Sequence, residues 1–179
     1  FLLNDEVREP RTYLSILTTI GAGHHAFGEI SEKSFVPKTN LSFYLQNLND
    51  LRIVERRVPA TIKPNEDSRK GRYHLADPYF RFYFRFLDPL REDLVHNRER
   101  VFRYIQAGLN SFVGSTAFEE LSGQWTYHQS RQGKMFEEFD RVGQYWSQTV
   151  QIDVVGINWK RKALLLGECK WEKNPLSVN

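Results

Sequence analysis

The sequence predicts a mixed α+β protein built in two parts. In the first part, apolar residues recur at three- and four-residue spacing through three successive segments, and two short β-rich segments follow. In the second part, a helical region leads to two aliphatic runs, 151–155 and 163–166, with a basic turn between them. Each run is too short for a stable helix, so the pair is expected to form a β-hairpin.

The first part has the element order of a winged helix-turn-helix. Helices are expected over 11–20, over about 26–33 and from Lys38 onward, where Thr39 or Asn40 is available as the N-cap of the third helix. Two strands are then expected, 53–58 and 72–75, separated by a polar loop. In such folds the third helix enters the major groove of DNA and the hairpin reaches phosphates. We therefore expect a winged-helix domain over 1–76.

Basic residues concentrate around the predicted first hairpin. Between Arg52 and Arg85, nine Lys or Arg residues stand against four Asp or Glu residues, a local excess of +5 that leaves −2 for the rest of the chain. A phosphate backbone would bind most readily there. The candidate nucleic-acid-binding residues are Lys38, Ser42 and Gln46 on the third helix and Arg56, Arg57, Arg69, Lys70 and Arg72 on the hairpin. The alternative is a winged helix that packs against another domain, since only Lys38 makes the third helix basic.

A helical connector is expected over 77–110. Asp77-Pro78 is typical of a helix start, and residues 79–86 are aromatic around most of a helix circumference. Such a helix would be buried on nearly all sides, so a core role is favoured over a base-stacking platform. Asp88-Pro89 is expected to break the chain, and further helices are expected up to Gly133. The next apolar stripe, over 111–129, has Glu119 on the same helix.

The C-terminal hairpin carries charged residues at one end. If its loop spans 159–162, Asn158 pairs with Ala163, and the same register sets Asp153 opposite Glu168. Alternate side chains share a strand face, so Glu168 and Lys170 point the same way. Two carboxylates within reach of one cation, with a Lys beside them, suit metal-dependent cleavage of a phosphodiester. The metal polarises the phosphate and generates hydroxide, and the Lys stabilises the charge that develops.

In these residues the sequence resembles the PD-(D/E)xK nuclease superfamily, whose pattern is an acid on one strand and acid-x-Lys on the next. Ile152-Asp153 stands where the superfamily has Pro-Asp, and Glu168-Cys169-Lys170 matches the second half. The resemblance implies a nuclease-like α/β domain over 111–179, truncated at its C-terminus. It implies Asp153 and Glu168 as ligands of Mg²⁺ or Mn²⁺, Lys170 as the stabilising cation, and Glu119, after Phe118, as the acid on the preceding helix.

A wider resemblance covers essentially the whole chain. Segments 1–6, 68–73, 75–82, 112–114 with 118–119, and 167–171 look like the C-terminal half of archaeal and bacterial predicted DEXX-box ATPases. In that family a P-loop ATPase domain precedes a winged helix and a nuclease-like domain of unknown function. The resemblance implies an ATPase domain before Phe1 and further strands and a helix after Asn179, and we interpret the chain as a fragment. It contains no Gly-rich phosphate loop, so no nucleotide site is assigned to it.

Other classes of site find less support in the sequence. The single Cys169 excludes a disulfide framework and a cysteine-based zinc site, and the histidines lack metal-ligand spacing. No Gly-x-Ser-x-Gly elbow or Cys-His pair indicates a covalent hydrolase. No apolar run approaches membrane-spanning length and no signal peptide is present, so we expect a cytoplasmic protein without a membrane partner.

Two functions remain as hypotheses. The first is a DNA-binding, nuclease-like module of an ATPase that cleaves phosphodiesters with Mg²⁺ or Mn²⁺, with DNA and the ATPase domain as partners. The alternative is a non-catalytic appendage that binds DNA or a protein partner and regulates the ATPase. The first hypothesis predicts DNA cleavage that requires Asp153. The second predicts DNA binding that does not require Asp153.

Overall fold

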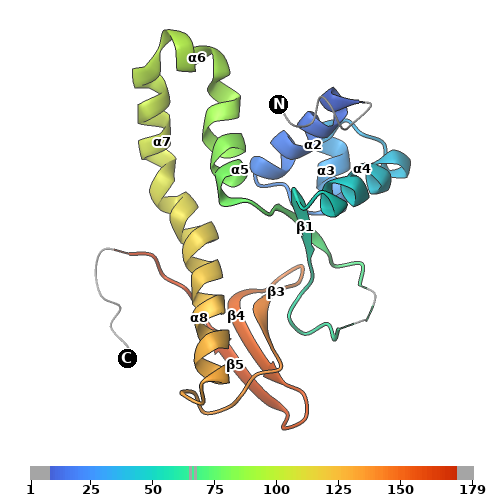
Figure 1. Ribbon diagram of the computed structural model, residues 1–179, viewed down its shortest axis with the longest axis vertical. Coiled ribbons are helices and arrows are strands. Elements are labelled where there is room, and N and C mark those ends of the chain that lie inside the picture. The colour runs from blue at the N-terminus through green and yellow to red at the C-terminus, as the bar shows by residue number, and fades with distance from the viewer. Residues whose placement is uncertain (1–8, 65, 67, 173–179) are drawn as a thin grey trace. The chain divides into compact units, whose positions relative to one another are not determined.

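A computed structural model of the chain describes residues 9–64, 66 and 68–172, and it is a mixed α+β structure, as predicted (Figure 1). The chain divides into two compact units, one formed by 1–57 and 69–104 and the other by 58–68 and 105–179. The predicted motif at 1–6 lies outside the described residues. The loop 58–68 interrupts the first unit in sequence and belongs to the second.

The first unit begins with three helices and a two-stranded antiparallel sheet, in the predicted order. These elements are α2 (Pro10–Gly21), α3 (Phe27–Ser34), α4 (Lys38–Asp50), β1 (Val54–Arg57) and β2 (Arg72–Leu75). In the sheet, Val54 pairs with Leu75 and Arg57 with Arg72. The apolar stripes of the helices form one core, whose fully buried members include Ile16, Leu17, Ile20, Ile30, Leu41, Leu45, Leu48 and Val54.

The predicted start of the third helix is wrong in its capping residue. Pro37 is the N-cap of α4, and Lys38 is already helical. Because the ring of Pro37 holds its φ at −56°, the N-cap lies two or three residues before the predicted caps Thr39 and Asn40. The Thr39 hydroxyl instead donates a hydrogen bond to the Asn40 side chain, at 3.2 Å.

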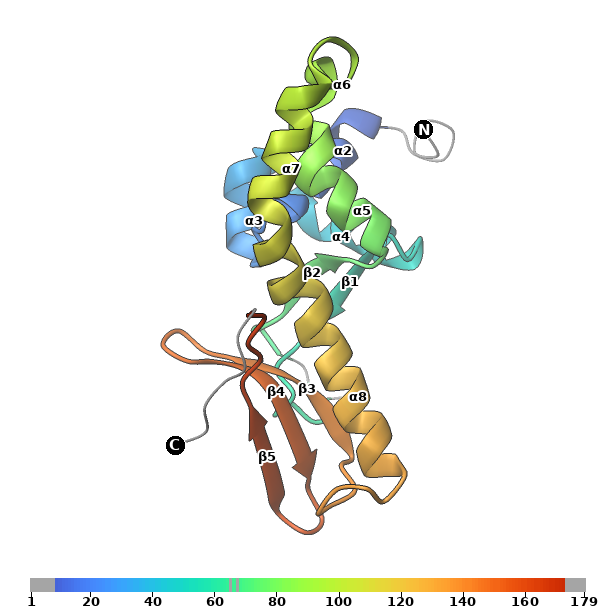
Figure 2. The ribbon, with the colours of Figure 1, turned by 90° about the vertical axis from the view of Figure 1, so that its left-hand side faces the viewer.

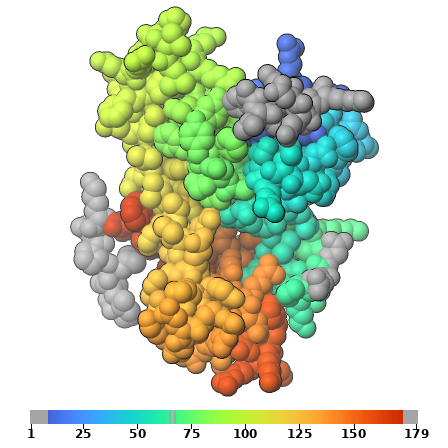
Figure 3. Space-filling model, in the orientation of Figure 1, coloured from blue at the N-terminus to red at the C-terminus, as the bar shows by residue number. Residues whose placement is uncertain are grey.

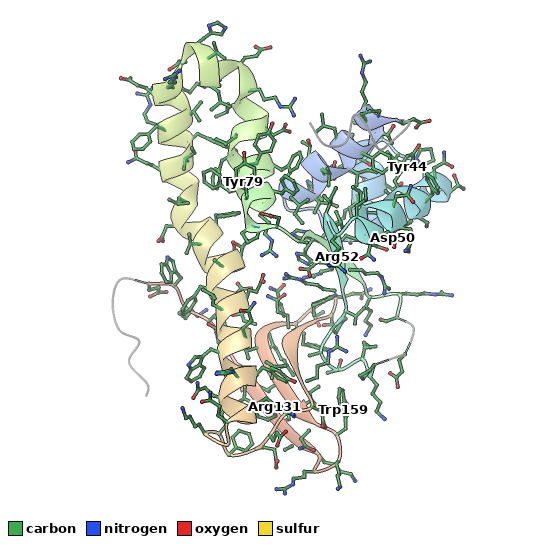
Figure 4. All side chains as sticks on the ribbon, in the orientation of Figure 1. Tyr44, Asp50, Arg52, Tyr79, Arg131 and Trp159 are labelled. Atoms are coloured by element: carbon green, nitrogen blue, oxygen red, sulfur yellow. The ribbon has the colours of Figure 1, made fainter. Side chains whose placement is uncertain are left out.

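An aromatic helical run follows the small sheet within the first unit. It consists of α5 (Pro78–Phe82), the π-helical η1 (Tyr83–Leu87), the 3₁₀ turn η2 (Asp88–Leu90) and α6 (Arg91–His96). The Asp77 carboxylate accepts a hydrogen bond from the backbone N–H of Tyr79 at 2.7 Å, which confirms the predicted helix start. Phe84 and Phe86 are fully buried, as a core role requires, whereas Tyr79 is exposed (Figure 4).

The predicted break at Asp88-Pro89 is a local interruption and does not end the helical run. The helix changes from π to 3₁₀ at Asp88, and Leu90, with φ of −121°, departs from helical geometry before α6 continues to His96. Proline is tolerated in the first turn of a helical segment, because the backbone N–H groups of that turn have no acceptor within the helix. The run ends instead at Asn97, whose φ of −148° is not helical.

The second unit packs a helix on a three-stranded antiparallel sheet. The helix α7 (Arg98–Phe112) begins in the first unit and ends in the second, and the π-helical η3 (Val113–Phe118) and α8 (Glu119–Arg131) continue it. The sheet has the order β3 (Arg141–Trp146), β4 (Gln151–Asn158), β5 (Ala163–Gly167). Helix α8 contacts β3 and β4 (Figure 2).

Two contacts support this sheet, one at β4 and one along β3. Gly156 lies against Phe139, and a Cβ at Gly156 would stand 2.9 Å from the Phe139 ring. The fully buried ring can therefore pack directly on the backbone of β4. Along β3, the backbone N–H of Ala60 donates to the carbonyl of Gln144 at 2.8 Å, so the loop 58–68 covers the outer edge of that strand.

Candidate active site

The register predicted for the C-terminal hairpin is confirmed. Asn158 pairs with Ala163, and the pairing continues to Val154 opposite Gly167. Residues 159–162 form the turn, in which Trp159 is marked in Figure 4. One step beyond the last pair, this register sets Asp153 across from Glu168. The Asp153 Oδ2 atom accepts a hydrogen bond from the backbone N–H of Cys169 at 2.9 Å, which ties the two chain segments together.

A β-bulge lies at Asp153, on the other side of β4. Gly143 of β3 pairs with Val155, whereas Tyr145 pairs with Ile152, so Asp153 and Val154 together stand opposite Gln144. Bulges of this kind disturb the alternation of side chains and re-aim a residue, and they are frequent beside active sites. The sequence analysis missed this feature, because it depends on β3, which no periodic pattern indicated.

Glu119 is the acid on the helix. It is the first residue of α8 and directly follows the π-helical η3, a type of segment that is common at functional sites. The Gln144 side chain donates a hydrogen bond from Nε2 to Glu119 Oε2, at 2.7 Å. Helix α8 and the bulged part of the sheet therefore meet at the Glu119 carboxylate. Gln144 is a site residue that the sequence analysis did not identify.

The pKa of Glu119 is shifted by its surroundings. Burial and the negative charges of Asp153 and Glu168 together raise this pKa to about 7, while the hydrogen bond from Gln144 opposes the shift. Glu119 is thus close enough to both predicted metal ligands to be affected by their charge.

Lys170 lies with the acids rather than away from them. Its Nζ atom is 2.7 Å from Glu168 Oε1, and both side chains are about half exposed. The hydrogen bond and charge of Glu168 raise the pKa of Lys170, with a further contribution from Asp153. Burial raises the pKa of the intervening Cys169 thiol, and the three carboxylates raise it further, so Cys169 is a packed thiol rather than a thiolate nucleophile.

Trp171 anchors the segment that carries Glu168 and Lys170. Its indole Nε1 donates a hydrogen bond to Asn110 Oδ1 at 2.9 Å, and its ring lies 5.2 Å from that of Phe118, measured between centroids. Gly114 makes room for it, since a Cβ there would stand 3.0 Å from the Trp171 Cβ. The chain after β5 is therefore held against the helix just before Glu119.

The donor set suits a hard divalent cation, because carboxylate oxygens are the ligands that Mg²⁺ prefers. Among the residues that the structure describes, no three or more His, Cys, Asp or Glu side chains lie close enough together to hold a metal ion. Mg²⁺ sites often use only one or two carboxylates, with water and phosphate oxygens completing the shell. Asp153 and Glu168 fit that simpler kind of site.

The candidate nucleic-acid-binding residues all belong to the first unit. On α4, Lys38, Ser42 and Gln46 are exposed, and Gln46 donates to Asp50 at 2.8 Å. On the hairpin, Arg56, Arg69 and Lys70 are exposed, whereas Arg57 and Arg72 are half-buried. Arg57 lies directly opposite Arg72, and like charges in such a pair repel. The Arg57 Nε atom donates a hydrogen bond to the Glu55 carboxylate at 2.7 Å, which offsets this repulsion. The Arg56 side chain lies across Gly71.

These features define a class of protein: a mixed α+β chain with a helix-rich unit, a helix-on-sheet unit and an acidic site at one end of the sheet. The chain belongs to the family described as archaeal and bacterial proteins of unknown function, whose model matches residues 83–178.

A curated relative aligns with nearly the whole chain. The chain is 32% identical over 174 residues to an uncharacterized protein of Methanocaldococcus jannaschii. The alignment covers 96% of this chain and 38% of the relative, so the chain spans well under half of the relative's length. No solved structure matches. Within the described residues, no helix is both long enough and apolar enough to cross a membrane.

Proposed function

We propose that the chain is a DNA-processing module in which the second unit is nuclease-like and the first unit binds DNA as a winged helix. The observation that carries the proposal is the geometry of the hairpin end, where the strand register sets Asp153 across from Glu168 and Asp153 Oδ2 accepts the backbone N–H of Cys169 at 2.9 Å. Lys170 Nζ lies 2.7 Å from Glu168 Oε1, beside these two acids. The raised pKa of Glu119, caused by burial and by the charges of Asp153 and Glu168, agrees with an acidic site of this kind, and such sites are typically functional.

Each residue of the site has a distinct task in this proposal. Asp153 and Glu168 hold one Mg²⁺ or Mn²⁺. When bound, the cation would polarise a phosphate and lower the pKa of a coordinated water molecule. Lys170, already beside Glu168, stabilises the charge that develops on the phosphate. Glu119, with its pKa near neutrality, accepts a proton during the attack by water.

The test of this proposal is cleavage of DNA by the intact protein. Plasmid and linear DNA are incubated with Mg²⁺ or Mn²⁺, and we expect Asp153→Asn to reduce the rate by about 100-fold or more, because the variant loses a metal ligand. The matched control is Asp140→Asn, which makes the same change in charge. Asp140 lies before β3 and accepts the N–H of Trp159, at the opposite end of β4. Equal cleavage by Asp153→Asn and the wild type would refute the proposal.

A second function, the non-catalytic appendage, is favoured by a different observation. The described residues hold no group of three metal ligands, whereas β1 and its surroundings are strongly basic. In this case the chain would bind DNA or a protein partner and regulate the ATPase domain of a longer protein. DNA binding would then weaken with salt and with Arg69→Ala or Lys70→Ala, and Asp153→Asn would leave it unchanged or tighter.

A further inference from the structure

Phe35 occupies an unusual position between α3 and α4. Its side chain is 91% exposed, although its neighbours Ser34 and Val36 are buried, at 5% and 6% exposure. Its backbone is left-handed, with φ of 58°. For a bulky residue this conformation is strained, and glycine or asparagine is usual where a helix ends in this way.

The strained conformation is imposed by contacts on both sides of Phe35. The Ser15 hydroxyl donates a hydrogen bond to the carbonyl of Ser34 at 3.0 Å, and the Ser31 hydroxyl donates one to the carbonyl of Val36 at 2.7 Å. Pro37, after Val36, restricts the backbone further. The turn therefore holds the backbone of Phe35 so that its side chain stands on the surface, where the ring adds little to the core.

The residues after Phe35 combine apolar and polar groups on one exposed helix. Phe43 of α4 is 63% exposed, and Lys38, Thr39 and Ser42 are also exposed. No acid occurs on α4 until Asp50, its last residue, which is labelled in Figure 4. Figure 3 shows part of α4 at the surface of the first unit. At helical spacing Lys38 shares a face of α4 with Ser42, and Thr39 shares the adjacent face with Phe43. An exposed cation, hydroxyl groups and exposed aromatic rings on one short stretch of chain are complementary to an anionic partner that has its own apolar faces.

We infer that Phe35 is a fixed apolar contact for DNA, with its ring against a base or deoxyribose while Lys38 and the neighbouring hydroxyl groups bind the phosphate backbone. Nucleic acid presents stacked apolar rings next to regularly spaced phosphates, and exposed aromatic side chains bind or wedge between its bases. The exposed cations Arg56, Arg69 and Lys70 of the same unit suit the same partner. The inference rests on the DNA-binding part of the proposed function and adds the contact residue.

The test compares stability with DNA affinity in Phe35→Gly of the intact protein. Glycine adopts the left-handed conformation without strain, so the melting temperature is expected to stay equal or rise. The affinity for a duplex oligonucleotide is expected to fall by about tenfold, as for the loss of one aromatic contact to a base. Because no charge is removed, the slope of log K against log salt stays unchanged, whereas Lys38→Ala lowers it by about 1.

The controls separate this inference from the proposed function. Phe35→Trp should restore the affinity, and Tyr79→Ala, which removes another exposed aromatic ring of the same unit, should leave it unchanged. If the wild type binds DNA and Phe35→Gly binds equally well, the inference alone is wrong. If Phe35→Gly lowers the melting temperature, the ring packs against protein and the inference is also wrong. If the wild type binds no DNA, the DNA-binding part of the proposed function is wrong as well.

Discussion

At the scale of single residues, Glu119 makes the stability of the second unit depend on pH. Its pKa is raised to about 7 in the folded protein, against about 4.5 for an ordinary glutamate. The folded state therefore binds this proton more tightly than the unfolded state does. By linkage, the stability that the proton contributes is present below about pH 4.5 and is lost as the pH rises to about 7.

We predict that Glu119→Gln stabilises the protein at pH 8 and has little effect at pH 5. The amide removes the charge that burial and the neighbouring carboxylates disfavour. Since Glu119 is partly exposed, solvent screening reduces the gain to about 1 kcal/mol. Urea unfolding at the two pH values measures it. An equal effect at both would show that the charge of Glu119 is not disfavoured.

Gln144 is expected to hold Glu119 in its charged form. We predict that Gln144→Leu raises the pKa of Glu119 further, because it removes the amide that donates to Oε2. A pH titration of the ¹³C-labelled carboxyl groups by NMR follows this group directly. Gln148→Leu, in the turn between β3 and β4, is the matched control and should leave the titration unchanged.

His74 gives the first unit the opposite dependence on pH. It stacks on His25 with ring centroids 4.1 Å apart, and its Nε2 atom is buried without a hydrogen-bond partner among the described residues. Burial and, to a smaller extent, the charges of His25, Arg57, Arg81 and Arg72 together lower the pKa of His74 to about 2. Protonation therefore favours the unfolded state, and stability is lost as the pH falls below about 6.5.

We predict that His74→Phe reduces this sensitivity to acid. A phenyl ring keeps the stack on His25 and cannot take up a proton. The melting temperature should fall less between pH 7.5 and pH 5 in the variant than in the wild type. The corresponding loss in free energy of unfolding should be smaller in the variant by about 2 kcal/mol. The exposed His96 provides the control, as His96→Gln should behave like the wild type.

At the scale of elements, the sequence predicted what local patterns determine and missed what distant pairing determines. The apolar stripes located α2, α3 and α4, and the turn at 159–162 fixed the register of β4 and β5. The bulge at Asp153 was missed because it requires β3 as a partner. The contact of Trp171 with Asn110 was missed because it joins residues 61 positions apart.

Gly114 provides a test of how the Trp171 anchor positions its segment. We predict that Gly114→Val destabilises the protein by about 1–3 kcal/mol, because the new side chain would clash with Trp171. The indole N–H signal of Trp171 should shift in the NMR spectrum as its bond to Asn110 is lost. Gly123→Ala on α8 is the control: nothing lies within 4 Å of its added Cβ, so it should stabilise the helix.

At the scale of the whole molecule, the two candidate functions lie on different units. The candidate nucleic-acid-binding residues belong to the first unit, and the three carboxylates with Lys170 belong to the second. The family is one of proteins of unknown function and the relative is uncharacterized, so the division of tasks between the units is tested by substitutions in each. If the units act as proposed, binding and cleavage can be changed separately by substitutions in each.

We predict that the double variant Arg69→Ala, Lys70→Ala lowers the salt slope of DNA binding by about 2, because two fewer phosphate contacts release two fewer counterions. The same variant should cleave normally once DNA is saturating, since it leaves Asp153 and Glu168 intact. Asp153→Asn should show the reverse, with an unchanged salt slope and lost cleavage. Lys134→Ala, an exposed cation of the second unit, serves as the charge control. If both variants changed binding and cleavage together, the two functions would share one site, and the division of tasks between the units would be wrong.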